Sequence, residues 1–127
     1  MRPNLLRWQY DAYRDYHADR VNLLIHIVAV PAFVACLGWL VADVVALRWT
    51  HAVTALVGAS VAFAVQGIGH KREASPSIPF DGAADAGSRI LAEQLITFPR
   101  FVLGGGFAAA LRRSREQVRR SEPGPGH

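Results

Sequence analysis

Two long uncharged hydrophobic stretches dominate the pattern of this chain, Val21–Ala42 and Trp49–Gly69. Each is about as long as a helix that crosses the hydrocarbon layer of a bilayer, which takes roughly 20 apolar residues. Only a short segment around Arg48 separates them. The pattern therefore predicts an all-α integral membrane protein built on a helical hairpin that turns near Arg48.

The segments on either side of the hairpin have mixed patterns. Residues 4–20 interleave aromatic and apolar positions with charges, which predicts an interfacial helix, because Trp and Tyr favour the headgroup level. Prolines and glycines in residues 74–88 predict a loop. The apolar segment Ile90–Leu111 predicts a third, re-entrant or interfacial helical piece. It is too broken for a full crossing, being interrupted by Glu93, Pro99, Arg100 and Gly104-Gly105-Gly106.

Length and charge refine this picture. A chain of 127 residues, 51% of them hydrophobic, is enough for one domain. Residues 1–111 are expected to form a single helical membrane domain, and residues 112–127 a basic, Pro/Gly-rich flexible tail. Basic residues flank the hairpin on both outer ends, whereas its turn carries only Arg48. The positive-inside rule then places both termini in the cytoplasm, and the net charge of +4 needs no nucleic-acid partner.

Two histidines occupy equivalent places in the predicted hairpin. His26 and His70 are each 22 residues from Arg48, so they lie at the same depth if the chain turns there. Asn22 shares a helix face with His26, and Glu73 shares one with His70 if the second helix continues. Antiparallel pairing of the two helices would therefore gather these four side chains.

His17 lies nine residues before His26, half a helical turn out of phase. It joins the cluster only if the chain bends between the interfacial helix and the first span.

Such a cluster is typical of a metal site. Ionisable groups in a membrane are costly and usually functional. Neutral imidazoles with a carboxylate suit Fe(II), and zinc accepts similar ligands. Glu73 is open to three roles: ligand, acid–base group, or a group that orients a ligand histidine. Asn22 is better suited to orienting than to ligation. Each histidine taken singly has another interpretation, as a hydrated polar residue at the membrane surface.

Several of these residues also match a known family. They are His17, Asn22, His26 and Pro31, then Gln66-Gly67-Ile68-Gly69-His70, Glu73 and Pro76, then Pro79-Phe80, Glu93-Gln94 and Pro99-Arg100-Phe101. The first two groups resemble the membrane family of the fungal 2-hydroxy fatty acid dioxygenase, and the last group is similar to a bacterial branch of that family, together over about residues 8–105. The bacterial branch implies a location in a bacterial inner membrane.

The resemblance implies an Fe(II)-dependent dioxygenase of fatty acid α-oxidation, which uses O2 to shorten a 2-hydroxy fatty acid by one carbon at the membrane. It implies that His17, His26 and His70 are iron ligands, with Glu73 close by. We expect Glu73 and Asn22 to be the catalytic neighbours of the metal. The spacing from His70 to Glu73 is shorter here than in the fungal pattern. Arg72 or Arg100 could pair with the substrate carboxylate, and the alternative for each is an interfacial anchor.

Two other functions remain open from the sequence. A haem protein could use His26 and His70 as axial ligands between two helices. A non-enzymatic membrane subunit or scaffold could use the small residues of the second span to bind partner helices. The oligomeric state and the chain length of a substrate have no signal in the sequence.

Overall fold

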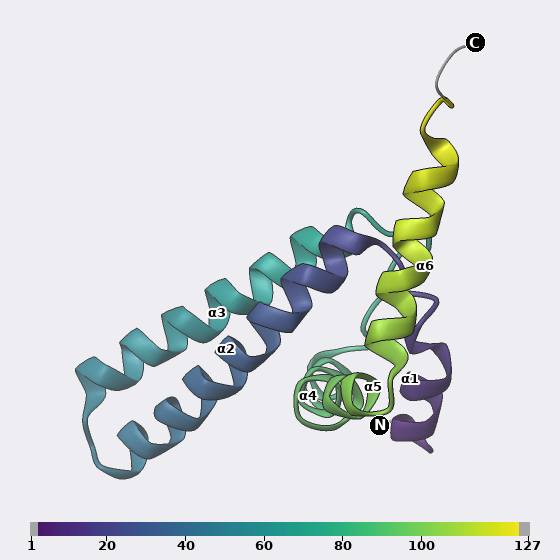
Figure 1. Cartoon of the computed structure of the whole chain (residues 1–127). Helices are drawn as coiled ribbons and strands as arrows, with labels where there is room; N and C mark the ends of the chain where they lie inside the picture. The colour runs from purple at the N-terminus through teal and green to yellow at the C-terminus, as the bar shows by residue number, and fades with distance from the viewer. Residues whose placement is uncertain (1–2, 125–127) are drawn as a thin grey trace.

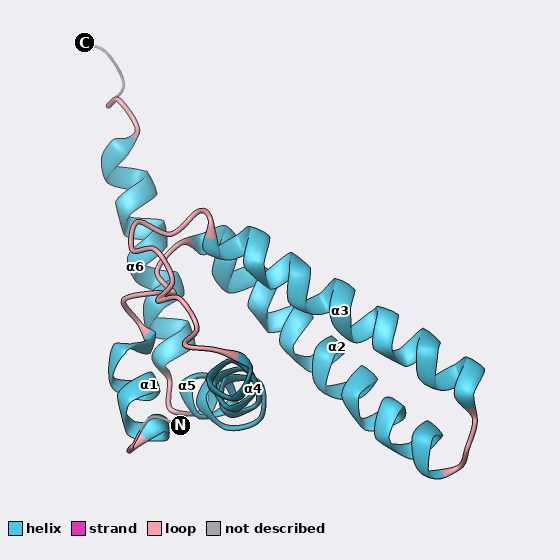
Figure 2. Cartoon of the chain, turned by 180° about the vertical axis from the view of Figure 1, so that it is seen from behind, coloured by secondary structure: helices cyan, strands magenta, loops and turns pink. Residues whose placement is uncertain are grey.

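The computed structural model describes residues 3–124, and all regular structure within that range is helical. Figure 1 shows the course of the chain, and Figure 2 shows it from behind. In chain order the elements are α1 (Leu5–Tyr13), α2 (Arg20–Val45), α3 (Trp49–His70), α4 (Ala83–Ala92), a π-helical turn η1 (Glu93–Thr97), α5 (Phe98–Leu103) and α6 (Gly106–Ser121).

Helices α2 and α3 lie side by side along their length and are joined by a three-residue connection at residues 46–48. This is where the sequence predicted the turn. Helix α3 approaches α2 closely because small residues face the partner helix. The buried residues of α3 are Ala52, Ala55, Ala59, Ala62, Gln66 and Gly69.

Both helices are long and apolar enough to cross a membrane. Their outer surfaces carry large apolar side chains that nothing in the described chain covers, including Val28, Trp39 and Val53. A soluble monomer rarely exposes contiguous apolar surface of this kind. Two long apolar helices with uncovered apolar flanks indicate membrane insertion.

The remaining helices gather at the end of the α2–α3 pair where α2 begins and α3 ends (Figures 1 and 2). An apolar core joins them to α2. Its buried members are Tyr13, Leu23, Val30, Phe98, Phe101 and Ala110. Side chains from α1, α2, α5 and α6 therefore meet in one cluster, which fixes the N-terminal and C-terminal parts of the chain against the same end of α2.

The flanking segments differ in detail from the sequence-based expectations. The interfacial helix expected over residues 4–20 ends at Tyr13, and residues 14–19 form the bend into α2. The expected loop over residues 74–88 is shorter, because α4 begins at Ala83.

The third apolar segment is not one helix. It contains the end of α4, η1, α5 and the start of α6. The helical run Ala83–Leu103 meets α6 at a bend of 70°. Gly105 adopts a φ of 81° at this bend, a left-handed conformation that glycine reaches without steric cost. Residues 112–121, expected in a flexible tail, continue α6 as a helix. The end of the tail, residues 125–127, lies outside the described residues.

Candidate metal centre

Two of the predicted ligand histidines are oriented by backbone carbonyls one helical turn earlier. His17 lies just beyond the end of α1, and its Nδ1 is 2.9 Å from the carbonyl oxygen of Tyr13. His26 lies in α2, and its Nδ1 is 2.9 Å from the carbonyl oxygen of Asn22. Since a carbonyl only accepts, each Nδ1 must carry the proton. Both Nε2 atoms therefore keep a lone pair for a metal.

His70, the last residue of α3, completes a triangle of imidazoles. Its ring centroid lies 4.7 Å from that of His17 and 4.9 Å from that of His26, and His17 and His26 are 4.7 Å apart. One nitrogen of each ring is buried without a hydrogen-bond partner among the described residues: Nε2 of His17, Nε2 of His26 and Nδ1 of His70. Three buried and unsatisfied nitrogens in one small volume are unfavourable unless they bind something.

The fourth member of the cluster is Glu93. Its Oε1 lies 3.5 Å from His17 Nε2 and 3.8 Å from His26 Nε2. One ligand atom from each of His17, His26, His70 and Glu93 lies within 4.8 Å of the others. These four side chains could hold a metal ion.

The carboxylate that sequence reasoning placed beside the histidines was Glu73, so the assignment of the acidic partner changes. Glu93 is the first residue of the π-helical turn η1, and such turns occur frequently at functional sites. A signal for it existed in the sequence. Glu93 is the lone carboxylate in an apolar segment, and a charge in such a place is a functional candidate by itself.

The electrostatics of Glu93 favour its ionised form. Burial by itself raises the pKa of this carboxyl. The interaction with His17 and the positive charges that the three histidines can carry outweigh burial, and they lower the pKa below its usual value. Tyr13 donates a hydrogen bond of 3.2 Å to Glu93 Oε1, and its ring stacks on His17 at 3.7 Å. Burial, followed by the charge of Glu93 and this hydrogen bond, raises the pKa of Tyr13 well above its usual value, so the phenol remains a donor.

Glu73 and Asn22 lie next to the cluster and outside the group of possible ligands. Glu73 accepts hydrogen bonds from the backbone N–H groups of Ala18 and Asp19, and from Asn22 Nδ2 at 2.7 Å. These contacts tie the start of α2 to the segment after α3, directly beside His17 and His70. Both residues therefore have the geometry of orienting groups rather than of ligands.

The two arginines suggested for a substrate carboxylate do not line the cavity beside the cluster. Arg72 donates to Asp19 Oδ2 at 3.1 Å, and the guanidinium of Arg100 stacks over the ring of Tyr10 at 3.9 Å. Of the lysines and arginines, Arg89 and Lys71 line the cavity instead.

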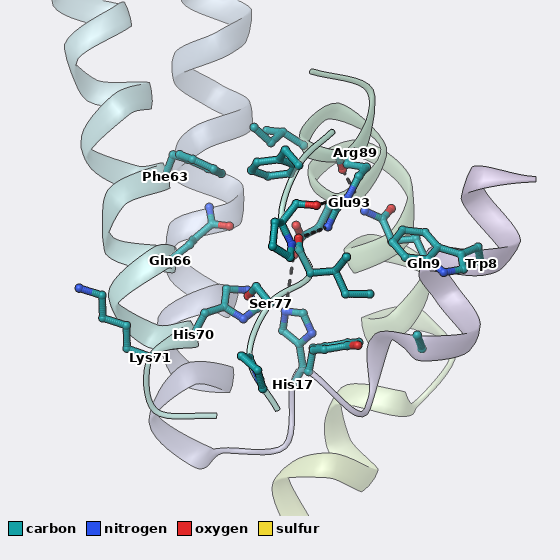
Figure 3. Close-up of a pocket in the computed structure, with 18 residues that line it drawn as sticks. Trp8, Gln9, His17, Phe63, Gln66, His70, Lys71, Ser77, Arg89 and Glu93 are labelled. Carbon is teal, nitrogen blue, oxygen red and sulfur yellow. Dashed lines mark hydrogen bonds and ion pairs between the residues drawn. The ribbon is translucent and has the colours of Figure 1, made fainter. Parts of the chain in front are cut away.

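That cavity has a volume of about 480 Å³ and reaches the cluster at His17, His70 and Glu93. Its walls are mostly apolar, from α1, α3 and the segment 76–80. Figure 3 shows Phe63 and Gln66 on the same side of α3 as His70, facing Glu93, whereas Lys71 points away. An apolar cavity with a few convergent polar groups at one end is typical of a ligand site.

A pair of buried side-chain amides connects two helices beside this site. Gln66 on α3 and Gln94 on η1 exchange two hydrogen bonds, of 3.0 and 2.7 Å. Gln94 is adjacent to Glu93 in the chain, so the pair fixes the position of η1 against α3.

No protein-family model matches this chain, and neither a curated protein nor a solved structure matches it significantly.

Proposed function

We propose that this protein is a non-haem, Fe(II)-dependent dioxygenase of the membrane that acts on 2-hydroxy fatty acids. The observation that carries the proposal is the set of three buried, unpartnered imidazole nitrogens beside the Glu93 carboxylate. Histidine nitrogens and a carboxylate oxygen are a suitable donor set for Fe(II), as in oxygenases that keep open positions for substrate and O2. The bound iron would supply O2 activation and polarise the substrate.

The protein residues have separate tasks in this proposal. His17, His26 and His70 would hold the metal, with Glu93 as a fourth ligand or as a base beside it. Backbone carbonyls keep His17 and His26 in the ligating tautomer. Tyr13 keeps Glu93 oriented through its hydrogen bond.

The cavity supports an amphiphilic substrate. Its polar end is the cluster, and its apolar walls would exclude water and receive an alkyl chain. A 2-hydroxy acid presents two oxygen donors next to one another at the end of such a chain. The resemblance of the histidine motifs to the fungal dioxygenase family favours the same substrate class.

The membrane arrangement is part of the proposal. Helices α2 and α3 would cross the bilayer as a hairpin, with α4, η1 and α5 at the interface. The arginines of α6 and those before α2 would then face the cytoplasm of a bacterial cell. The metal cluster, at the end of the hairpin where α2 begins, would lie near the inner surface of the membrane.

The haem alternative fits the geometry less well. The ring centroids of His26 and His70 lie only 4.9 Å apart, with His17 and Glu93 next to both, which leaves no room for a porphyrin between the two rings. A purely structural subunit would have no use for three buried imidazole nitrogens without hydrogen-bond partners. Purified protein with a Soret band would favour haem, and full function of a variant without histidines would favour a scaffold.

The direct test is O2 uptake by purified protein in detergent, reconstituted with Fe(II) and given 2-hydroxyhexadecanoic acid. We expect uptake that depends on both iron and the hydroxyl group. The matched control substrate is hexadecanoic acid, which lacks only the hydroxyl. Iron-loaded protein that consumes no O2 with hydroxy acids of any chain length would refute the proposal.

A further inference from the structure

The cavity beside the metal cluster shares one wall with the surface of a candidate membrane span. Phe63, Gln66, Gly67 and His70 all line it and all belong to α3. They are spaced by three, one and three residues, which places them on one face of the helix. Helix α3 is long and apolar enough to cross a membrane, so this wall separates the cavity from the expected lipid.

Gly67 leaves a gap in that wall. It is exposed, it lines the cavity, and a Cβ built on it would meet no atom within 4 Å. Its neighbours along the helix face, Phe63 and His70, carry rings. The space next to Gly67 is therefore unfilled at the exposed surface of α3, and it borders the cavity.

Another side of the cavity is covered by the chain itself. Residues 76–80 line it, and Arg89 holds them in place. The Arg89 guanidinium donates to the carbonyls of Ile78 at 2.8 Å and Pro79 at 3.0 Å, and it lies over the ring of Phe80 at 4.6 Å. Arg89 is itself buried, so opening this side would break several contacts of a buried cation, which is costly.

We infer that Gly67 forms a lateral opening through which the alkyl chain of a lipid-derived acid passes from the bilayer into the cavity. The acid's polar end would face the cluster while its chain lies against α3. The inference rests on the proposed function for the chemistry of the occupant, and it adds the route and the residue that limits it. A side chain at position 67 would narrow the opening and exclude long chains first.

The test compares Gly67→Phe with Gly38→Phe. Gly38 is the matched control because it is also an exposed glycine in a candidate span, also has no atom within 4 Å of a built Cβ, and does not line the cavity. The probe is 11-(dansylamino)undecanoic acid, whose fluorescence rises on transfer to an apolar site. Metal content is measured on the same samples.

We expect Gly67→Phe to retain its metal and to bind the probe at least about tenfold more weakly than the wild type, as a filled pocket rejects a ligand. Gly38→Phe should bind like the wild type. Gly67→Leu, a smaller block, gives the same test if the phenylalanine variant does not fold. Unchanged probe binding by a folded, metal-loaded Gly67 variant would overturn the inference.

The two proposals fail in different ways. A wild-type protein that binds the probe, with the expected loss in Gly67→Phe, but consumes no O2 with hydroxy acids would refute the dioxygenase and leave the lateral opening standing. A wild-type protein that does not bind the probe would refute the lateral opening, whatever its activity.

Discussion

His17 Nε2 lies 3.5 Å from Glu93 Oε1, although the two residues are 76 positions apart in the chain. The histidine comes from the bend between α1 and α2, and the carboxylate comes from a π-helical turn that packs against both α1 and α2. This pairing joins the N-terminal and C-terminal parts of the chain at the one place where the imidazoles of α2 and α3 also meet. The cluster that could hold a metal thus also connects distant segments of the chain, and loss of one of its side chains should affect both metal binding and stability.

Replacement of a ligand histidine tests the cluster most directly. We expect His70→Ala to bind Fe(II) or Zn(II) more than about 100-fold more weakly, since even loss of a group behind a ligand costs about 10–100-fold. Metal analysis of the purified variant measures this. His51→Ala is the matched control, because His51 is an exposed residue of the same helix outside the cluster. Equal loss of metal in both variants would contradict the assignment.

We expect replacement of the two glutamates to affect different properties, metal affinity for Glu93 and stability for Glu73. Glu93→Gln removes a possible ligand oxygen and should lower metal affinity strongly. Glu73→Gln loses the charge that receives the N–H groups of Ala18 and Asp19, and should lower the free energy of unfolding by about 1–2 kcal/mol. It should still bind one metal when metal is in excess. Titration calorimetry and thermal unfolding of both variants distinguish the roles, and the reverse pattern would restore Glu73 as the ligand.

Tyr13 should act on the cluster through its hydroxyl and its ring separately. Tyr13→Phe removes the hydrogen bond to Glu93 and keeps the stacking on His17. We expect a modest loss of metal affinity, about fivefold to tenfold, for one bond to a charged group. Tyr13→Ala also removes a buried ring and should destabilise the fold by about 3–5 kcal/mol. Metal titrations and chemical unfolding would show whether the two effects separate. A Tyr13→Phe variant with as low a free energy of unfolding as Tyr13→Ala would argue against separate roles for the hydroxyl and the ring.

Gly69 should tolerate no side chain. A Cβ built on it falls against the side chain of Asn22, which is fully buried and donates to Glu73. Gly69→Ala must displace Asn22, whose backbone carbonyl orients His26. We expect weaker metal binding and a lower melting temperature. Gly38→Ala, where the added Cβ meets nothing within 4 Å, should be neutral by both measurements.

Acid should release the metal before it unfolds the protein. Protons compete with the metal for the imidazole nitrogens, which must be deprotonated to bind it, so metal affinity falls as the pH falls. The pKa of Glu93 lies below its usual value. Its contribution to stability is therefore complete above the unfolded pKa and is lost only as pH falls through the lower folded pKa. Metal content and circular dichroism followed from pH 7 to pH 3 should show loss of metal before loss of helical signal. Simultaneous loss of both would indicate that protonation of Glu93 causes metal release and unfolding together.

The sequence by itself determined the parts of the fold that depend on local composition. Two uninterrupted apolar stretches specify two long helices, because no other local structure satisfies their backbone in an apolar surrounding. The position of Arg48 between them specified the turn, and that turn made His26 and His70 equivalent. The same reasoning allowed His17 to join if the chain bent before α2, and the bend at residues 14–19 brings it into the cluster.

The tertiary structure alone decided which carboxylate completes the cluster. Glu73 is three residues from His70, and Glu93 is 23 residues away, so proximity along the chain favoured Glu73. Glu93 reaches the histidines only because η1 is held against α3 by the Gln66–Gln94 pair and against α1 and α2 by packing. Contacts between distant segments carry no periodic signal in one sequence, since they depend on how completed helices pack. The residues that line the cavity also depend on helix packing. Arg72 binds Asp19 and Arg100 stacks on Tyr10, so neither lines the cavity, whereas Gly67 does.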